Sequence, residues 1–243
     1  MKNGIKFLLQ RLLGYPNYLY LFALFMIKKL PFDKRERDFM HLLRFIKEDD
    51  TVLDIGANIG VMTYHLAKKA ASGHVFAIEP LPSNVRVIRQ IVTKYHLTNV
   101  SVLPFAVGEE NGISKMILPR KGGVLYHGLA HIQGKQQTAE GHQVEVTIKR
   151  IDDIPELMTH KIGAIKLDVE ESEYSVLQGA KGIISANKPV IYCELWNTKN
   201  RYQTFDLMLS MGYNAWIRSQ GNLVPADVLT TKQNFFFLPE NQL

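Results

Sequence analysis

Hydrophobic positions follow two different patterns along the chain, and the change falls near residue 50. Residues 1–50 alternate apolar runs with Lys and Arg at helical spacing and contain no strand pattern. From Thr51 onward, TVLDI has the pattern of a short buried strand, GANIG that of a turn, and VMTYHLAKKA that of an amphipathic helix. The pattern therefore predicts a helical extension over residues 1–50 and one α/β domain over residues 51–243.

Strands and helices continue to alternate through the first half of the domain. Strands are predicted at His74–Glu79 and Val100–Leu103, with a helix between them from Pro82 to about His96. This order builds a parallel sheet with right-handed crossovers. The stretch from Phe105 to Arg150 breaks the pattern with the run KMIL, an irregular loop from Arg120 to Gly141, and the alternating strand QVEVTIKR. We expect this stretch to form an insertion or flap over the edge of the sheet.

The C-terminal part returns to the α/β pattern. Helices are predicted from about Ser172 to Ser185 and from about Arg201 to Met211. The predicted strands bring the main sheet to seven and are AIKLD, PVIYCEL, Tyr213–Ile217 and Asn234–Leu238. The fold class expected from the whole pattern is therefore α/β, with a Rossmann-like, seven-stranded and mostly parallel sheet.

Composition narrows the classes of function. Cys193 is the only cysteine, which excludes an intramolecular disulfide and a cysteine-based metal site and fits a reducing, cytoplasmic setting. The net charge of +6 favours anionic partners. Because the basic residues are scattered from Lys2 to Lys232 without a dense run, we expect no nucleic-acid partner.

The apolar run YPNYLYLFALFMI at Tyr15–Ile27 bears on localisation. It is shorter than the roughly 18 to 20 apolar residues that span a bilayer, and no small-residue cleavage site follows it. We expect a helix packed on the domain. The alternative is peripheral membrane contact through residues 15–29, with Lys28 and Lys29 at the headgroups and with inserted side chains of Tyr18, Leu19, Phe22 and Phe25.

The run DIGANIG after the first strand is the first candidate for ligand binding. Gly56 and Gly60 allow a tight turn and close backbone approach, and Asp54 lies at the carboxyl end of the strand, where ligands bind in such sheets. Glu79 ends the next strand, in the position of an acid that accepts hydrogen bonds from both ribose hydroxyls of a nucleoside. A nucleoside cofactor is therefore expected.

The composition of this loop distinguishes between cofactors. The loop lacks the GxGxxG motif and has Asn58 and Gly60 instead. Its first residue is Asp54. A pyrophosphate prefers bare amides without a nearby carboxylate, whereas the amino group of a methionine moiety favours one. The loop thus favours S-adenosylmethionine, with a nicotinamide-dependent oxidoreductase as the alternative.

Five motifs in order resemble the FkbM-type methyltransferases, a class I family, over roughly Asp50 to Pro239. They are VLDIGANIG, VFAIEPLPSN, NVSVLPFAVG, IKLDVEESEYSVLQGA and NFFFLP. The resemblance implies a sheet whose last strand inserts antiparallel. It also implies an S-adenosylmethionine-dependent O-methyltransferase whose acceptor is a hydroxyl on a sugar, a glycan or a small-molecule natural product. One departure is Glu171, which stands where the family usually has the glycine of DVEG.

Acids at the ends of two later strands are the candidate catalytic residues. A hydroxyl acceptor needs a general base or a metal, and the base candidates are Asp168, Glu170 and Glu194, with Glu173 beside them. Asp168 could instead cap a helix, and Glu170 and Glu173 could be exposed acids at a helix start. Trp196 and Asn197 could line the acceptor pocket.

Other groups in the sequence are weaker candidates. Four acids in one neighbourhood raise a Mg²⁺ or Ca²⁺ hypothesis, but their spacing matches no cation-binding loop, and we expect no metal site. His127, His131 and His142 lie in the irregular insertion without zinc-site spacing. The apolar N-terminal segment and Glu171 also leave open a catalytically degenerate scaffold.

Overall fold

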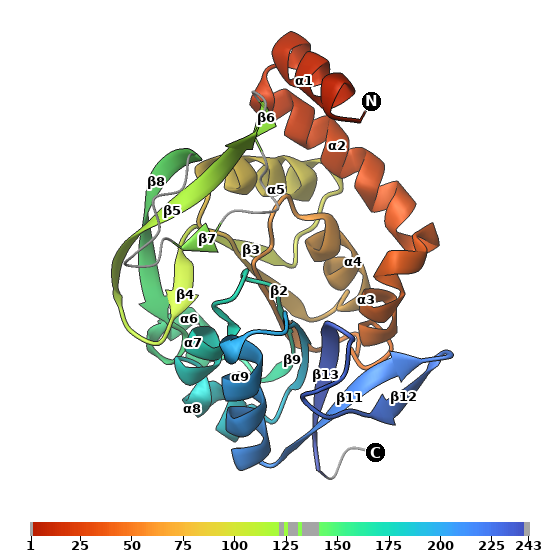
Figure 1. Cartoon of the computed structure of the whole chain (residues 1–243), viewed down its shortest axis with the longest axis vertical. Coiled ribbons are helices and arrows are strands. Elements are labelled where there is room, and N and C mark those ends of the chain that lie inside the picture. Colours follow the sequence, from red (N-terminus) through yellow and green to blue (C-terminus); the bar gives the residue numbers. More distant parts are fainter. Residues whose placement is uncertain (1, 122–123, 126–130, 133–140, 241–243) are drawn as a thin grey trace.

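The computed structural model describes residues 2–121, 124–125, 131–132 and 141–240, and its centre is an eight-stranded sheet (Figure 1). The strands of this sheet are β1 (Thr51–Ile55), β2 (His74–Ile78), β3 (Val100–Leu103), β9 (Ile162–Leu167), β10 (Val190–Glu194), β11 (Tyr213–Ser219), β12 (Asn222–Pro225) and β13 (Asn234–Pro239). Their order is β12-β11-β13-β10-β9-β1-β2-β3. The five strands from β10 to β3 are parallel, and β13 is antiparallel to both its neighbours. The Rossmann-like α/β class and the antiparallel last strand are confirmed.

Alternate residues of the central strands pack into two different cores. On one face, Leu53 and Ile55 lie in a cluster with side chains of α7 (Glu173–Gln178), α8 (Lys181–Asn187) and α9 (Lys199–Ser210). On the other, Val52 and Val75 pack with α4 (Val61–Lys69) and α5 (Pro82–Lys94). Because both faces are covered, the strands read as continuous apolar runs.

The N-terminal residues are helical, as expected. They form α1 (Lys2–Leu13), α2 (Tyr15–Lys29), η1 (Leu30–Phe32), η2 (Lys34–Glu36) and α3 (Arg37–Leu42). Helix α2 packs across α4 and α5 and buries Tyr18, Leu19, Ala23 and Ile27. The alternative in which Tyr18 and Leu19 insert into a membrane is therefore wrong, because both side chains belong to the protein core.

In the described part of the chain, no helix has the length and apolarity needed to cross a membrane.

The expected insertion forms a second sheet. Its strands are β4 (Ala106–Gly108), β5 (Gly112–Lys121), β6 (Val124–Leu125), β7 (His131–Ile132) and β8 (Gly141–Arg150). The long antiparallel pair β5 and β8 curves beside the main sheet (Figure 1). Met116, Leu118 and Val146 pack on Leu81, so the ribbon covers the chain that follows β2. The short elements η4 (Ile151–Asp153) and α6 (Pro155–Met158) lead back to β9.

Two details differ from the sequence-based expectation. The main sheet has eight strands instead of seven, because β12 forms a hairpin with β11 across Gln220 and Gly221, both at positive φ. The helix expected over Ser172–Ser185 is two helices, α7 and α8, separated near Gly179. A Cβ at Gly179 would lie 2.0 Å from the carbonyl oxygen of Gly108, so the chain passes closely under β4 there.

Candidate active site

The loop after β1 turns at glycines that the backbone geometry requires. Gly56 has φ of +72°, and a Cβ there would lie 1.8 Å from the carbonyl oxygen of Asp168. Gly60 has φ of +76° at the start of α4, and Asn58 between them has φ of +52°. Side chains at 56 or 60 would be strained, and at 56 would also collide with β9. The loop therefore lies tightly against the carboxyl end of β9.

Glu79 connects this loop to the end of β2. Its carboxylate accepts hydrogen bonds from the amide of Asn58 (2.9 Å), the amide of Leu81 (2.9 Å) and Nδ2 of Asn84 (3.2 Å). Burial raises the pKa of Glu79 to about 7, although these three donors act in the opposite direction. The acid expected to bind ribose is thus already oriented by the cofactor loop.

Asp54 is fully buried and binds groups of the protein itself. Oγ1 of Thr63 donates to its Oδ2 at 2.6 Å, and Nζ of Lys166 lies 3.3 Å from its Oδ1. The contact expected between Asp54 and a ligand amino group stays a prediction. What the structure adds is that Asp54 links β1 to α4 and to the neighbouring strand β9.

Lys166 is the residue that sequence reasoning missed. It is 2% exposed, and its ammonium donates to the carbonyl of Gly56 at 2.8 Å and lies 3.8 Å from the carboxylate of Asp168. Burial disfavours its charged form, but the carboxylates of Asp54 and Asp168 outweigh this and raise the pKa of Lys166. A lysine inside the apolar run AIKLD was the available signal, because a buried charge needs partners.

Carboxylates gather at the carboxyl ends of β9 and β10. The pKa of Glu170 and that of Glu194 are both raised to about 7. Burial is the largest cause, and neighbouring carboxylates, including that of Asp168, add to it. Burial also raises the pKa of Glu173 to about 7, and this buried side chain binds the amide of Val169 and Nδ2 of Asn200. The structure thus brings the three predicted base candidates to one rim, while Glu173 is held inside the protein.

Glu36 joins this rim from the N-terminal extension. Glu36 is half-buried, and its pKa is raised. Burial is the largest cause, the charge of Asp33 is the next cause that raises it, and Asp168 makes a smaller contribution. Its charge also contributes to the raised pKa of Glu194. Because Glu36 lies far from β9 and β10 in sequence, only tertiary packing identifies it.

The turn after β9 keeps the conformation of a glycine without having one. Glu170 has φ of +50° and Glu171 has φ of +68°, in the left-handed region that favours glycine. At Glu171, the departure from the family motif therefore introduces a side chain at a backbone position whose left-handed conformation favours glycine. It also adds a negative charge beside Glu170, whose pKa Glu171 helps to raise.

Two pockets meet at the cofactor loop. One, of about 660 Å³, is lined by Glu79 and Asn84, by Phe105 and Met116, and by Asp168 and Glu170. The other, of about 590 Å³, is lined by Phe22, Met26 and Leu30 of the N-terminal extension, by Glu36, by Val61 and Met62 of α4, and by Lys166. Both contain Gly56, Asn58 and Asp168. The loop therefore separates a pocket at the end of β2 from one under α2.

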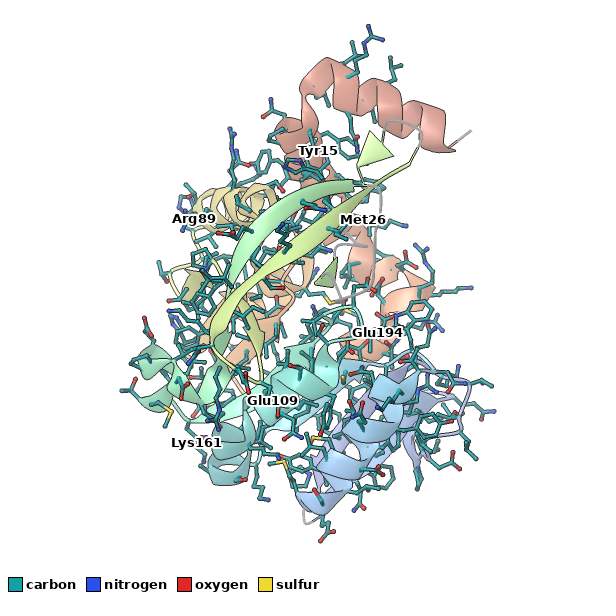
Figure 2. All side chains as sticks on the ribbon, turned by 60° about the vertical axis from the view of Figure 1, so that its left-hand side comes forward. Tyr15, Met26, Arg89, Glu109, Lys161 and Glu194 are labelled. Carbon is teal, nitrogen blue, oxygen red and sulfur yellow. The ribbon has the colours of Figure 1, made fainter. Side chains whose placement is uncertain are left out.

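Glu194 lies at the end of β10, and Figure 2 shows it between Met26 of α2 and the helix α9. Trp196 and Asn197 follow it and are exposed, and neither lines the two pockets. His142 is exposed on β8, and the side chain of His131 and all of His127 lie outside the described residues. Among the residues that are described, no three His, Cys, Asp or Glu side chains are placed to hold a metal ion.

The ion pair between Lys166 and Asp54 predicts a strong, non-additive effect on stability. Lys166→Met leaves a buried carboxylate unpaired and should lower the free energy of unfolding by about 3–5 kcal/mol. Adding Asp54→Asn removes that charge and should restore about 1–2 kcal/mol. Urea unfolding followed by circular dichroism measures both changes.

The matched control is Lys161→Met, at the exposed residue just before β9. It should change the free energy of unfolding by less than about 0.5 kcal/mol. Additive losses in the double variant would show that the two charges do not depend on each other.

The backbone at Glu171 gives a second prediction. Glu171→Gly removes the cost of a positive φ, about 1–2 kcal/mol, but loses about 0.5–1 kcal/mol to the flexibility of the unfolded chain. The free energy of unfolding should therefore stay the same or rise by up to about 1.5 kcal/mol, as measured by urea unfolding. Glu171→Gln keeps the strain, so an equal gain in that variant would assign the effect to charge instead of backbone.

Both variants should lower the pKa of Glu170, as measured by carboxyl NMR titration.

Two curated methyltransferases are similar to this chain. The chain is 25% identical over 174 residues to "Methyltransferase 1" of Beauveria bassiana, which covers 61% of this chain and 69% of the relative. It is 25% identical over 153 residues to "Methyltransferase sdnD" of Sordaria araneosa, with coverage of 53% and 59%. The chain thus spans between half and three quarters of the length of these curated relatives.

Among solved structures, methyltransferase FkbM from Methylobacillus flagellatus KT superposes with a TM-score of 0.55 at 19% identity, covering 79% of this chain and 44% of that one. This similarity supports the fold. The family model of the methyltransferase FkbM domain matches residues 54–222, which include the loop after β1, Glu79, and the carboxylates of Asp168, Glu170 and Glu194. The chain belongs to the FkbM methyltransferase family.

Proposed function

We propose that this methyltransferase uses S-adenosylmethionine to methylate a hydroxyl oxygen of a sugar, a glycan or a small-molecule natural product. The observation that carries the proposal is the meeting of two pockets at Gly56, Asn58 and Asp168, with Glu79 in one and the acidic rim beside both. This arrangement suits a nucleoside on one side of the loop and an acceptor hydroxyl near the carboxylates.

The pocket at the end of β2 fits the nucleoside part of the cofactor. The carboxylate of Glu79 offers about four acceptor positions, and three donors of the protein use it. Capacity remains for a ribose hydroxyl, and Leu81, Phe105 and Met116 offer apolar contact to a purine.

The start of α4 fits the amino-acid end of the cofactor. The first amides of an α-helix have no acceptor within the helix, and the helix dipole favours a carboxylate there. Val61 and Met62 belong to this first turn and line the pocket under α2. Because Gly56, Asn58 and Asp168 line both pockets, we assign the two ends of one cofactor to the two sides of the loop.

The acidic rim supplies the base chemistry. When bound, the cofactor supplies an electrophilic methyl group on a sulfonium sulfur, and the bond from carbon to sulfur breaks as the bond to the acceptor oxygen forms. We assign the hydroxyl proton to Asp168, which lines both pockets, or to Glu194 on the same rim, whose pKa of about 7 suits a base at neutral pH. Holding the reactants in line supplies most of the remaining acceleration.

The direct test is incubation of the purified protein with isotopically labelled S-adenosylmethionine and extracts of host metabolites and glycans, followed by mass spectrometry. We expect one labelled product class whose methyl group is on oxygen. Calorimetry with S-adenosylmethionine and with NADH runs in parallel. Cofactor binding without transfer to any acceptor would favour a degenerate scaffold, and binding of NADH alone would reject the proposed cofactor.

Glu79 predicts how cofactor affinity depends on pH. The ionised carboxylate accepts hydrogen bonds from ribose hydroxyls much more strongly than the protonated form, and its pKa before binding is about 7. Affinity for S-adenosylhomocysteine should therefore rise about tenfold from pH 6 to pH 8 and then level off. Glu79→Gln should weaken binding by about 10- to 100-fold and remove this dependence, because a charged acceptor is lost. Calorimetry across pH measures both effects.

The control is Glu109→Gln, which changes an exposed acid of the same type outside both pockets. It should keep the affinity and the pH dependence of the wild-type protein. A Glu79→Gln protein that folds and still shows the full rise with pH would assign the dependence to another group.

Glu194 is predicted to act on turnover. Glu194→Gln should lower kcat by about 100-fold or more at unchanged cofactor affinity, because loss of a general base has effects of this size. In the wild-type protein the rate should rise with pH through about 7, as Glu194 ionises, and this rise should flatten in the variant. Asp168→Asn distinguishes the two candidate bases, and Glu240→Gln is the control at an exposed acid. Normal turnover in Glu194→Gln would leave the proton transfer to Asp168.

A further inference from the structure

Four helices on one side of the main sheet carry basic residues but no acidic ones. Helices α1, α2, α4 and α5 contain no Asp or Glu, and they carry ten of the 29 Lys and Arg residues: Lys2, Lys6, Arg11, Lys28, Lys29, Lys68, Lys69, Arg86, Arg89 and Lys94. These helices contact one another as α1 on α2 and as α2 on α4 and α5. These four helices therefore form a strongly basic part of the layer on that side of the sheet, and the acids Asp33, Glu36 and Asp38 lie beyond the end of α2, in and beside η2 and α3.

A groove between α2 and α5 concentrates part of this charge. Tyr20 of α2 and the exposed side chains of Arg86, Arg89 and Lys94 line an open hollow of about 1320 Å³, and no acid lines it. Figure 2 shows Arg89 at the border of the molecule, in the half that contains α1 and α2. The groove suits anionic groups presented from outside.

Large apolar side chains stand exposed on the same N-terminal helices. On α1, Leu8 is 54% and Leu12 is 71% exposed, one helical turn apart. On α2, Leu21 is 49% and Phe25 is 59% exposed, again one turn apart, and Phe32 beyond its end is 85% exposed. Figure 1 shows α1 and α2 along the upper right edge of the molecule, away from β12. Such a set of exposed apolar side chains marks a contact surface.

We propose that this face, made of α1, the outer side of α2 and the groove with α5, docks on an anionic lipid bilayer. Exposed leucines and phenylalanines beside lysines and arginines are the pattern of a surface-bound amphipathic helix. A nucleic acid would match the cations, but it has no apolar phase in which the exposed leucines and phenylalanines could insert. A second copy of the chain would bring two strongly basic faces together, with repulsion between them.

The residues that insert differ from those that the sequence alone suggested. Tyr18 and Leu19 face the core, and the opposite stripe of α2, with Leu21 and Phe25, faces outward. Of the two lysines after it, Lys29 pairs with Asp33 at 3.0 Å, while Lys28 is exposed. The proposal is independent of the methyl-transfer activity, because it concerns a surface outside both pockets.

The test is flotation of the full chain with vesicles of phosphatidylcholine alone and with vesicles in which a third of the lipid is phosphatidylglycerol. We expect binding to the anionic vesicles, weak binding to the neutral ones, and loss of binding as salt screens the charges. Leu12→Gln and Phe25→Gln should each lower binding by about tenfold, since each removes a large apolar side chain from the interface. Both side chains are exposed, so the fold should be unaffected.

Leu229→Gln is the matched control, at a leucine that is 73% exposed between β12 and β13, on another part of the molecule. It should bind the anionic vesicles like the wild-type protein. Arg86→Ser with Arg89→Ser should weaken binding to anionic vesicles and leave binding to neutral ones unchanged.

Four results would overturn the proposal. They are no binding to either kind of vesicle, equal binding to both kinds, an equal loss in Leu229→Gln, and a folded dimer in light scattering that Phe25→Gln dissociates. The last result would assign the face to a second copy of the chain. Binding of single-stranded RNA that depends on Arg86 and Arg89, in the absence of vesicle binding, would assign it to nucleic acid.

Discussion

A single buried cation holds the active-site end of the sheet together. Lys166 is 2% exposed and contacts the carboxylate of Asp54 and the carbonyl of Gly56, so it joins β9 to β1 and to the loop that follows β1. Removing either Lys166 or Asp54 would leave the other charge buried without its partner, and a buried unpaired charge strongly destabilises the fold. The loop geometry, and with it the position of Glu79 against the amide of Asn58, depends on this pair.

The acidic rim follows from that arrangement. Asp168 lies 3.8 Å from Lys166 and is partly exposed, while Glu170 and Glu194 are half-buried among other carboxylates. Burial and mutual repulsion bring the pKa of Glu170 and Glu194 to about 7. A rim of this kind can accept a proton near neutral pH, which a fully solvated carboxylate does poorly. The positive φ of Glu171 directs the chain around this rim without the usual glycine.

The sequence predicted those parts of the molecule that depend on local pattern. The first strand, the loop at Gly56 and the following helix were predicted correctly because buried strands, left-handed glycines and helix periodicity are local properties. The β12 hairpin was missed although Gln220-Gly221 forms its turn, and the break at Gly179 was missed because it results from close passage under another strand. Lys166 and Glu36 were missed for a similar reason: their importance comes from neighbours that are distant in sequence.

The charged residues behind the net charge of +6 are distributed unevenly over the molecule. Carboxylates line the candidate site, and α1, α2, α4 and α5 on the other side carry basic but no acidic residues. Helix α2 belongs to both regions, because Phe22 and Met26 form a wall of the second pocket while Leu21 and Phe25 point outward. In the proposed orientation on a bilayer, one helix therefore separates the lipid surface from the site.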